Sequence, residues 1–210
     1  MKTKIQLSEE EWNLAMNAGI LLTKNRVMEK LSEFLGEIAT VSKTIFHTES
    51  IMLPVSTPWK TPKISRGENY QGLPYLVLDY PRFFYRDDVF AIRTMFWWGN
   101  YFSITIHLKG IFCQHFKQAI LESLEILSEN QFLINTTAAE WNHAIGEEYI
   151  LISEFGKEKI RQKCSDDSLL KLAVKIPLQD LDLTGKIITD YYQLIASVLK
   201  INFQVDEKDL

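Results

Sequence analysis

Residues 88–109 read DVFAIRTMFWWGNYFSITIHLK, and this stretch decides the fold class. β-branched and aromatic residues dominate it, as is typical of strands. From Tyr101 to Lys109 apolar residues alternate with polar ones, which indicates a strand with two different faces. Gly99-Asn100 separates this run from the preceding one and is expected to form a two-residue hairpin turn. The sequence therefore predicts an antiparallel hairpin in the middle of a sheet.

A two-residue turn would set the register of the hairpin, with Trp98 facing Tyr101 and Trp97 facing Phe102. Each strand then divides its side chains between two faces of the sheet. One face is expected to hold Ala91, Arg93, Met95, Trp97, Phe102, Ile104, Ile106 and Leu108. The other face is expected to hold Phe90, Ile92, Thr94, Phe96, Trp98, Tyr101, Ser103, Thr105 and His107.

Arg93 stands among apolar neighbours in this register. A guanidinium cannot lose its charge, so burial there requires a carboxylate or a bound anion. We expect Asp79 or Glu122, or else an opening that admits an anion, within hydrogen-bond reach of Arg93.

Helices are predicted before and after the hairpin. Ser8 followed by Glu11 forms a capping box, and apolar residues at helical spacing continue from there to about residue 42. A central helix is predicted over 112–129, and a last one begins near Asp182. The other strand candidates are 73–80, 132–135, 148–153 and 169–176. Strands and helices without βαβ regularity predict an α+β fold, with an antiparallel or mixed sheet packed by N-terminal, central and C-terminal helices.

The length and composition suit one domain. With 210 residues, 46% hydrophobic and 24% charged, we expect a single globular α+β domain over 1–210. Four prolines and two glycines within 49–74 predict a loop that runs extended over the surface.

The net charge and the length of the apolar runs limit the possible location and partners of the protein. A formal net charge of -4 provides no positive field for nucleic acid, so no nucleic-acid partner is predicted. The first residues lack the apolar segment of a signal peptide, and no apolar run approaches the length of a membrane span. We expect a cytoplasmic protein with no membrane partner.

The short motifs of nucleotide-binding proteins, zinc-dependent hydrolases, serine hydrolases and calcium-binding loops are absent from the sequence. Glu140 and His143 have E-x-x-H spacing, but a carboxylate-bridged metal site needs two such pairs. We interpret them as a polar surface segment with Trp141 as a local anchor. Cys113 and Cys164 belong to no C-x-x-C pair. No metal and no cofactor is predicted.

Arginines and aromatic residues concentrate in 59–107, which contains four of the six arginines. This composition is typical of recognition surfaces, although ordinary sheet packing with surface ion pairs to Asp79, Asp87 and Asp88 explains it too. The residues predicted to bind a ligand are Arg82, Arg86, Arg93, Trp98, Tyr101 and His107.

Three functions fit these residues. The first is a non-enzymatic domain that binds a small molecule or a protein through the sheet face. The second is an enzyme acting on a small anionic substrate, with His107 as general acid or base and Arg93 or Arg82 orienting an acidic group. The third is a structural subunit of a homo-oligomer. A closed cavity with His107 and an unpaired arginine would favour the enzyme, and a flat aromatic patch would favour a partner.

Overall fold

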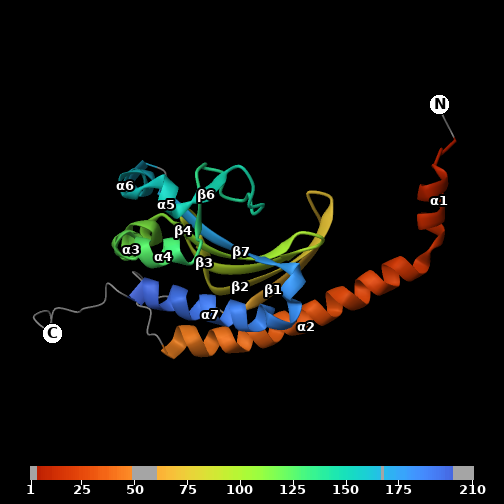
Figure 1. The fold of residues 1–210 in the computed structure, drawn as a ribbon, viewed down its shortest axis with the longest axis horizontal. Helices are drawn as coiled ribbons and strands as arrows, with labels where there is room; N and C mark the ends of the chain where they lie inside the picture. Colours follow the sequence, from red (N-terminus) through yellow and green to blue (C-terminus); the bar gives the residue numbers. More distant parts are fainter. Residues whose placement is uncertain (1–3, 49–60, 167, 201–210) are drawn as a thin grey trace, which may run out of the picture.

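The computed structural model describes residues 4–48, 61–166 and 168–200 (Figure 1). Within these ranges seven strands form one antiparallel sheet in the order β1-β2-β3-β4-β7-β5-β6. The strands are β1 (Lys63–Tyr70), β2 (Leu73–Tyr85), β3 (Asp88–Trp97), β4 (Tyr101–Lys109), β5 (Leu133–Asn135), β6 (Tyr149–Leu151) and β7 (Leu169–Pro177). The predicted α+β fold is confirmed.

Helices surround this sheet. They are α1 (Glu9–Met16), α2 (Ala18–Thr48), α3 (Ile111–Glu122), α4 (Leu124–Glu129), α5 (Ile152–Phe155), α6 (Lys157–Asp166), the 3-10 turn η1 (Leu178–Asp180) and α7 (Leu181–Lys200). The capping box at Ser8 and Glu11 is confirmed at the start of α1. No helix in the described ranges is long and apolar enough to cross a membrane.

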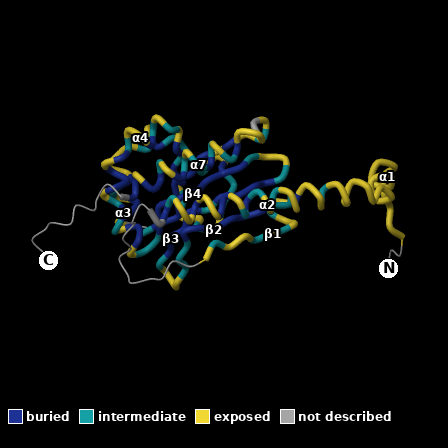
Figure 2. The backbone as a smooth tube through the Cα atoms, turned by 90° about the horizontal axis from the view of Figure 1, so that it is seen from below, coloured by how far each residue is buried: buried dark blue, intermediate teal, exposed yellow. Residues whose placement is uncertain are grey.

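The main core lies between the sheet and two long helices. Helices α2 and α7 lie side by side along one face of the sheet (Figure 1). The fully buried side chains of α7, including Ile188 and Tyr192, belong to the same apolar cluster as Leu78 of β2 and Ile104 of β4. Figure 2 shows this buried centre in dark blue, with the first part of α2 and all of α1 exposed.

The hairpin turn is one residue longer than predicted. Trp97 pairs with Tyr101, and Phe96 pairs with Phe102. The turn therefore has three residues, 98–100, and Asn100 N donates to Trp97 O at 3.0 Å. Gly99 has a φ of 72°, in the left-handed region that glycine adopts without strain. The predicted register was wrong, because Trp97 and Phe102 point to opposite sides of the sheet.

This correction exchanges the two faces of β4. Because the side-chain period of a strand is two, a shift of one residue moves every side chain of β4 to the other face. Phe102, Ile104, Ile106 and Leu108 join the helix-covered face, and all four are fully buried. Tyr101, Ser103, Thr105 and His107 join Arg93 and Met95 on the opposite face.

Part of the predicted proline-rich loop forms a strand. Residues 49–60 lie outside the described residues, but Lys63–Tyr70 form β1 and pair with β2. The prediction of a loop as far as residue 74 was therefore wrong over β1 and the start of β2. Strand β1 lies at one edge of the sheet, where charged side chains are common.

Replacing Phe102 by alanine tests the corrected register. The Phe102 ring is fully buried and lies edge-on to Phe34 of α2, with ring centroids 6.0 Å apart. We expect Phe102→Ala to lower the free energy of unfolding by about 3–5 kcal/mol, measured by urea denaturation. Leu183→Ala, at a 57% exposed position, serves as control and should change it by less than about 0.5 kcal/mol. A loss no larger than that of the control would contradict the register.

Candidate functional site

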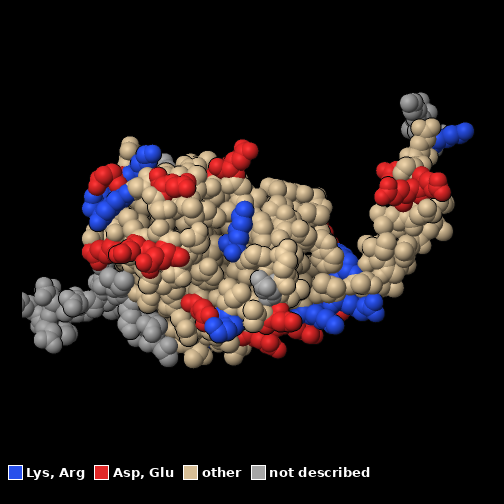
Figure 3. All heavy atoms as spheres, viewed as in Figure 1, with Lys and Arg blue, Asp and Glu red and all other residues tan. Residues whose placement is uncertain are grey.

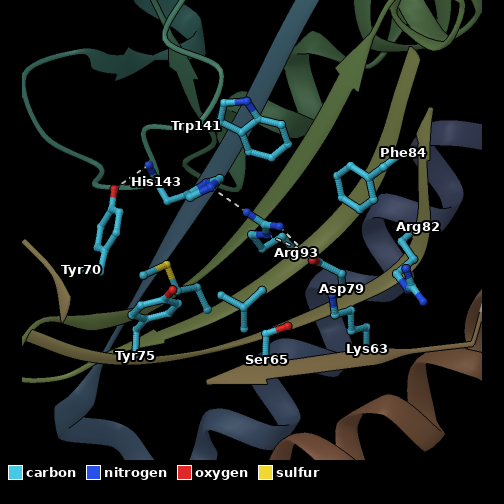
Figure 4. Close-up of a pocket in the computed structure, with 12 residues that line it drawn as sticks. Lys63, Ser65, Tyr70, Tyr75, Asp79, Arg82, Phe84, Arg93, Trp141 and His143 are labelled. Carbon is cyan, nitrogen blue, oxygen red and sulfur yellow. Dashed lines mark hydrogen bonds and ion pairs between the residues drawn. The ribbon is translucent and has the colours of Figure 1, made fainter. Parts of the chain in front are cut away.

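A pocket of about 330 Å³ lies on the sheet face opposite α2 and α7 (Figure 4). Its lining includes three cationic side chains, one carboxylate and four aromatic rings. The charged residues are Lys63, Arg82, Arg93 and Asp79, and the rings belong to Tyr70, Tyr75, Phe84 and Trp141. Strands β1, β2 and β3 form its floor, and the segment 136–148 between β5 and β6 supplies Trp141 and His143.

A bulge in β2 directs Arg82 and Phe84 into the pocket. Asp79 pairs with Arg93 and Arg82 pairs with Ala91, so β2 has one more residue than β3 between these two pairs. Arg82 stands three positions after Asp79, so in a regular strand without a bulge it would point to the helix-covered face. The bulge places Arg82 on the same side as Asp79, while Phe83 packs against Phe112 in the core.

Tyr75 lies in the pocket because Gly67 leaves room for its ring. The two residues pair across β1 and β2, and a Cβ built on Gly67 would come within 2.3 Å of the Tyr75 ring. The Tyr70 ring contacts Tyr75 edge-on, with centroids 5.8 Å apart. These rings form the apolar end of the pocket.

Arg93 and Asp79 form a two-pronged ion pair at the centre of the pocket floor. Arg93 Nε donates to Asp79 Oδ1 at 2.7 Å, and Nη2 donates to Oδ2 at 2.8 Å. Their side chains are only 14% and 8% exposed. The prediction of a carboxylate, Asp79 or Glu122, within hydrogen-bond reach of Arg93 is confirmed, and the carboxylate is that of Asp79.

His143 is held in its neutral form by Arg93. Arg93 Nη1 lies 2.6 Å from His143 Nε2. Because a guanidinium can only donate, Nε2 must accept, and the ring proton sits on Nδ1. Burial, with the nearby Arg93 charge, lowers the pKa of His143 to about 2. His143 is therefore neutral across the physiological pH range.

The segment 136–148 is fixed over the sheet by side chains from three strands. Tyr70 Oη accepts hydrogen bonds from the backbone N of His143 and Ala144, both at 2.7 Å. Tyr101 Oη accepts one from Ile145 N at 2.7 Å. The fully buried Lys171 donates to Glu140 O at 2.9 Å and to Asn142 O at 2.5 Å, and its burial lowers its pKa to about 8. The pocket wall is thus preformed.

His107 lies outside the pocket lining, beneath Trp141. The two rings meet edge-on with centroids 5.7 Å apart. The His107 side chain is 3% exposed, with Nε2 3.5 Å from Glu140 Oε1, and Glu140 in turn accepts a bond of 2.8 Å from Lys109 Nζ. Burial, followed by the positive charges of Lys171, Arg93 and Lys109, lowers the pKa of His107 to about 3. A covered histidine with this pKa is unsuited to general acid or base catalysis near neutral pH.

The other predicted residues are dispersed. Arg82 and Arg93 line the pocket, and Tyr101 supports its wall through Ile145. Trp98 lies in the hairpin turn and packs at the margin of the helix-side core. Arg86 is exposed in the turn after β2, with its guanidinium 5.1 Å from the Tyr85 ring centroid.

Sequence reasoning missed the contributions of Tyr70, Glu140, Trp141, His143 and Lys171. The E-x-x-H spacing with an intervening tryptophan was the available signal, but it was interpreted as an exposed polar segment. Only Trp141 of that segment is mainly exposed, and Glu140 and His143 turn toward the sheet. Lys171 had no local signal, because it lies within an apolar strand.

The described residues contain no group of three or more His, Cys, Asp and Glu side chains that could hold a metal ion. Cys113 and Cys164 are buried free thiols outside the pocket lining. No family model, no curated protein and no solved structure matches this chain.

Removing the Arg93 guanidinium should destabilise the fold. Arg93→Met leaves the Asp79 carboxylate buried without its partner, and we expect the free energy of unfolding to fall by about 3 kcal/mol. The double variant Asp79→Leu with Arg93→Met removes both charges and should recover most of the loss. Urea denaturation of the two variants measures both effects. A single variant as stable as the wild type would contradict a structural role for the ion pair.

The two buried histidines should make the protein acid-sensitive. An unfolded chain takes up protons on histidine below pH about 6.5, whereas His107 and His143 in the folded state stay neutral until far lower pH. The unfolded state then binds more protons, so stability falls as the pH decreases below about 6.5, by at most about 1.4 kcal/mol per pH unit for each histidine.

His107→Gln isolates one part of this effect. Its loss of stability between pH 6 and 4 should be smaller than that of the wild type by about 1.4 kcal/mol per pH unit. The unfolding free energy at several pH values gives both slopes. Equal slopes in wild type and variant would show that His107 titrates alike in the folded and unfolded states.

Proposed function

We propose that this protein binds a small anionic molecule with an aromatic or apolar body in the pocket between β1, β2, β3 and the segment 136–148. The observation that carries this proposal is the charge balance of the pocket: three cationic side chains face a single carboxylate, among four aromatic rings. A preformed concavity with apolar walls and a few oriented polar groups is typical of a small-molecule site.

Arg82 and Lys63 are the groups that would receive the anion. Asp79 neutralises Arg93, whereas neither Arg82 nor Lys63 has a carboxylate partner among the described residues. Arg82 Nε donates to Thr61 O at 2.9 Å, which orients the side chain and leaves its terminal nitrogens for a ligand. A guanidinium presents a planar fork that matches carboxylate and phosphate oxygens.

Aromatic walls would hold the body of the ligand. Phe84 and Trp141 lie near each other, with ring centroids 6.3 Å apart, and Figure 4 shows both rings at the Arg82 end of the pocket. Tyr75 and Met95 line the other end. A volume of about 330 Å³ is near the lower limit for ligand pockets, which favours a small molecule over a polymer.

Binding without catalysis is supported better than the enzymatic alternative. An enzyme was expected to combine His107 with an unpaired arginine in one cavity. His107 is instead covered by Trp141, and Arg93 is paired with Asp79. The other histidine, His143, uses Nε2 to accept from Arg93. Neither imidazole is placed to exchange a proton with a bound molecule near neutral pH.

A set of simple anions tests this proposal. Trp141 lines the pocket, so tryptophan fluorescence and the melting temperature should respond to inorganic phosphate, benzoate or adenosine monophosphate. We expect at least one of the three to bind at millimolar concentration, and Arg82→Met to weaken that binding by at least about tenfold, or 1.4 kcal/mol.

Two controls decide the outcome. Arg161→Met removes an arginine of α6 whose side chain is 43% exposed and lies outside the pocket lining, and it should leave binding unchanged. Benzamide has the shape of benzoate without its charge, so we expect it not to bind in the pocket. Equal binding of benzamide, or no binding of any of the three anions, would overturn the proposal.

A further inference from the structure

The N-terminal arm, defined as residues 5–27, leaves the body of the protein with its apolar side chains uncovered (Figures 1 and 2). Helix α1 has no buried residue. Trp12, Leu14 and Met16 are 57%, 58% and 69% exposed. The exposed apolar series of the arm consists of Ile5, Leu7, Trp12, Leu14, Met16, Ile20, Leu21, Leu22 and Val27.

The rest of α2 shows that this exposure is confined to the arm. From Met28 onward the helix buries residues at helical spacing, with Leu35, Ile38 and Phe46 in the main core. Residues 18–27 of this continuous helix therefore leave their apolar side chains exposed and reach β1 only through the polar contacts of Lys24 and Asn25, whereas the helix packs in the main core from Met28 onward. Contiguous exposed apolar surface of this kind marks an interaction site.

Charge along the arm is self-complementary. Residues 5–23 contain three glutamates, Glu9, Glu10 and Glu11, and no basic residue. Residues 24–30 contain Lys24, Arg26 and Lys30 against the single Glu29. Figure 3 shows acidic side chains over α1, with a basic one beyond them toward the N-terminus, and further basic ones where α2 meets the body.

We propose that two copies of this chain associate through their arms, with α1 of each copy lying antiparallel along residues 18–30 of the other. This two-fold arrangement brings Glu9 and Glu10 of one copy near Arg26 and Lys30 of its partner, and the partner's glutamates near the first copy's basic residues. The surface suits a second copy because Glu9 and Glu10 find opposite charges in Arg26 and Lys30 of the same surface, whereas Lys24 already pairs with Glu68 of its own chain.

The apolar series fits the same arrangement. In the antiparallel pairing the apolar part of α1, residues 12–16, lies opposite residues 20–22 of the other copy. Ala18 and Gly19 lie near the two-fold axis, where small side chains let two helices approach closely. The chain changes direction at Asn17, whose ψ is 85°, so that α1 leaves the line of α2 and can reach across to a partner.

A lipid surface is the competing occupant, and the charges favour the second copy. Helices that bind membrane surfaces combine an apolar face with basic residues that meet anionic headgroups. The apolar part of this arm instead adjoins three glutamates, which such a surface would repel. The arm is also remote from the pocket, so this inference does not depend on the proposed ligand.

Charge reversal in the full-length chain tests the pairing. Sedimentation equilibrium should give twice the chain mass for the wild type. Glu9→Lys with Glu10→Lys places basic residues on α1 as well as on residues 24–30, with Glu11 kept, and Arg26→Glu with Lys30→Glu leaves Lys24 as the one basic residue of 24–30. Each double variant alone should dissociate at least tenfold more readily than the wild type. An equimolar mixture of the two should restore a dimer that contains both variants, because opposite charges then face each other again.

Hydrophobic substitutions complete the experiment. Leu14→Glu with Leu21→Glu should give monomers, whereas Leu183→Glu, at a 57% exposed position on α7, should leave the dimer intact. Circular dichroism confirms that each variant is folded. A wild type that stays monomeric at its highest soluble concentration overturns the proposal, and sedimentation of that monomer with phosphatidylcholine–phosphatidylserine vesicles would identify lipid as the occupant. A mixture that remains monomeric overturns the antiparallel pairing.

Discussion

The ion pair between Arg93 and Asp79 determines how the open face of the sheet is organised. A guanidinium keeps its charge at any physiological pH, so placing it on a mostly buried sheet face requires acceptors on every side. Asp79 provides two oxygens and His143 provides one nitrogen. His143 accepts only because it is neutral. The backbone of the segment 136–148 must then bring this ring to Arg93, and Tyr70 and Lys171 hold the segment in place.

Positive charge accumulates around this pair, and it explains the low pKa values nearby. Lys171 and Arg93 both disfavour protonation of His107 and His143, in addition to the effect of burial. The face therefore contains cations that keep their charge and imidazoles that do not gain one. This asymmetry supports the proposal that the pocket holds an anion and does not transfer a proton.

The sequence predicted the strands of the central hairpin well but not the register between them. The extents of β3 and β4 follow from β-branched and aromatic residues, whose preference is local. The register depends on the turn, and Gly99-Asn100 suggested two residues where the structure has three. The predicted register put Arg93 beside Ile104 and Ile106, whereas the observed one places the aliphatic side chains of β4 on the helix-covered face and Ser103, Thr105 and His107 on the face of Arg93. An arginine left among apolar neighbours was itself a sign that the register was wrong by one.

The pocket was harder to predict, because its parts meet only after folding. Arg82 and Phe84 reach it through a bulge that strict alternation along β2 does not reveal. His143 and Trp141 come from a segment without regular secondary structure, where no periodicity indicates which side chain points inward. Arg93 was identified because a guanidinium keeps its charge and therefore needs an acceptor wherever it is buried. Asp79 was one of the two carboxylates named for it, whereas His143 was not named.

Strand β1 connects the two regions to which a binding role is assigned. Lys63 and Ser65, at the start of β1, line the pocket. Side chains on the other face of β1 contact the base of the arm. Lys24 of α2 pairs with Glu68, and Arg66 donates to Asn25 at 3.3 Å. An edge strand has a neighbour on one side only, so these contacts with α2 replace part of the support that a second strand would give. These contacts link the base of α2 to the strand that contributes Lys63 to the pocket.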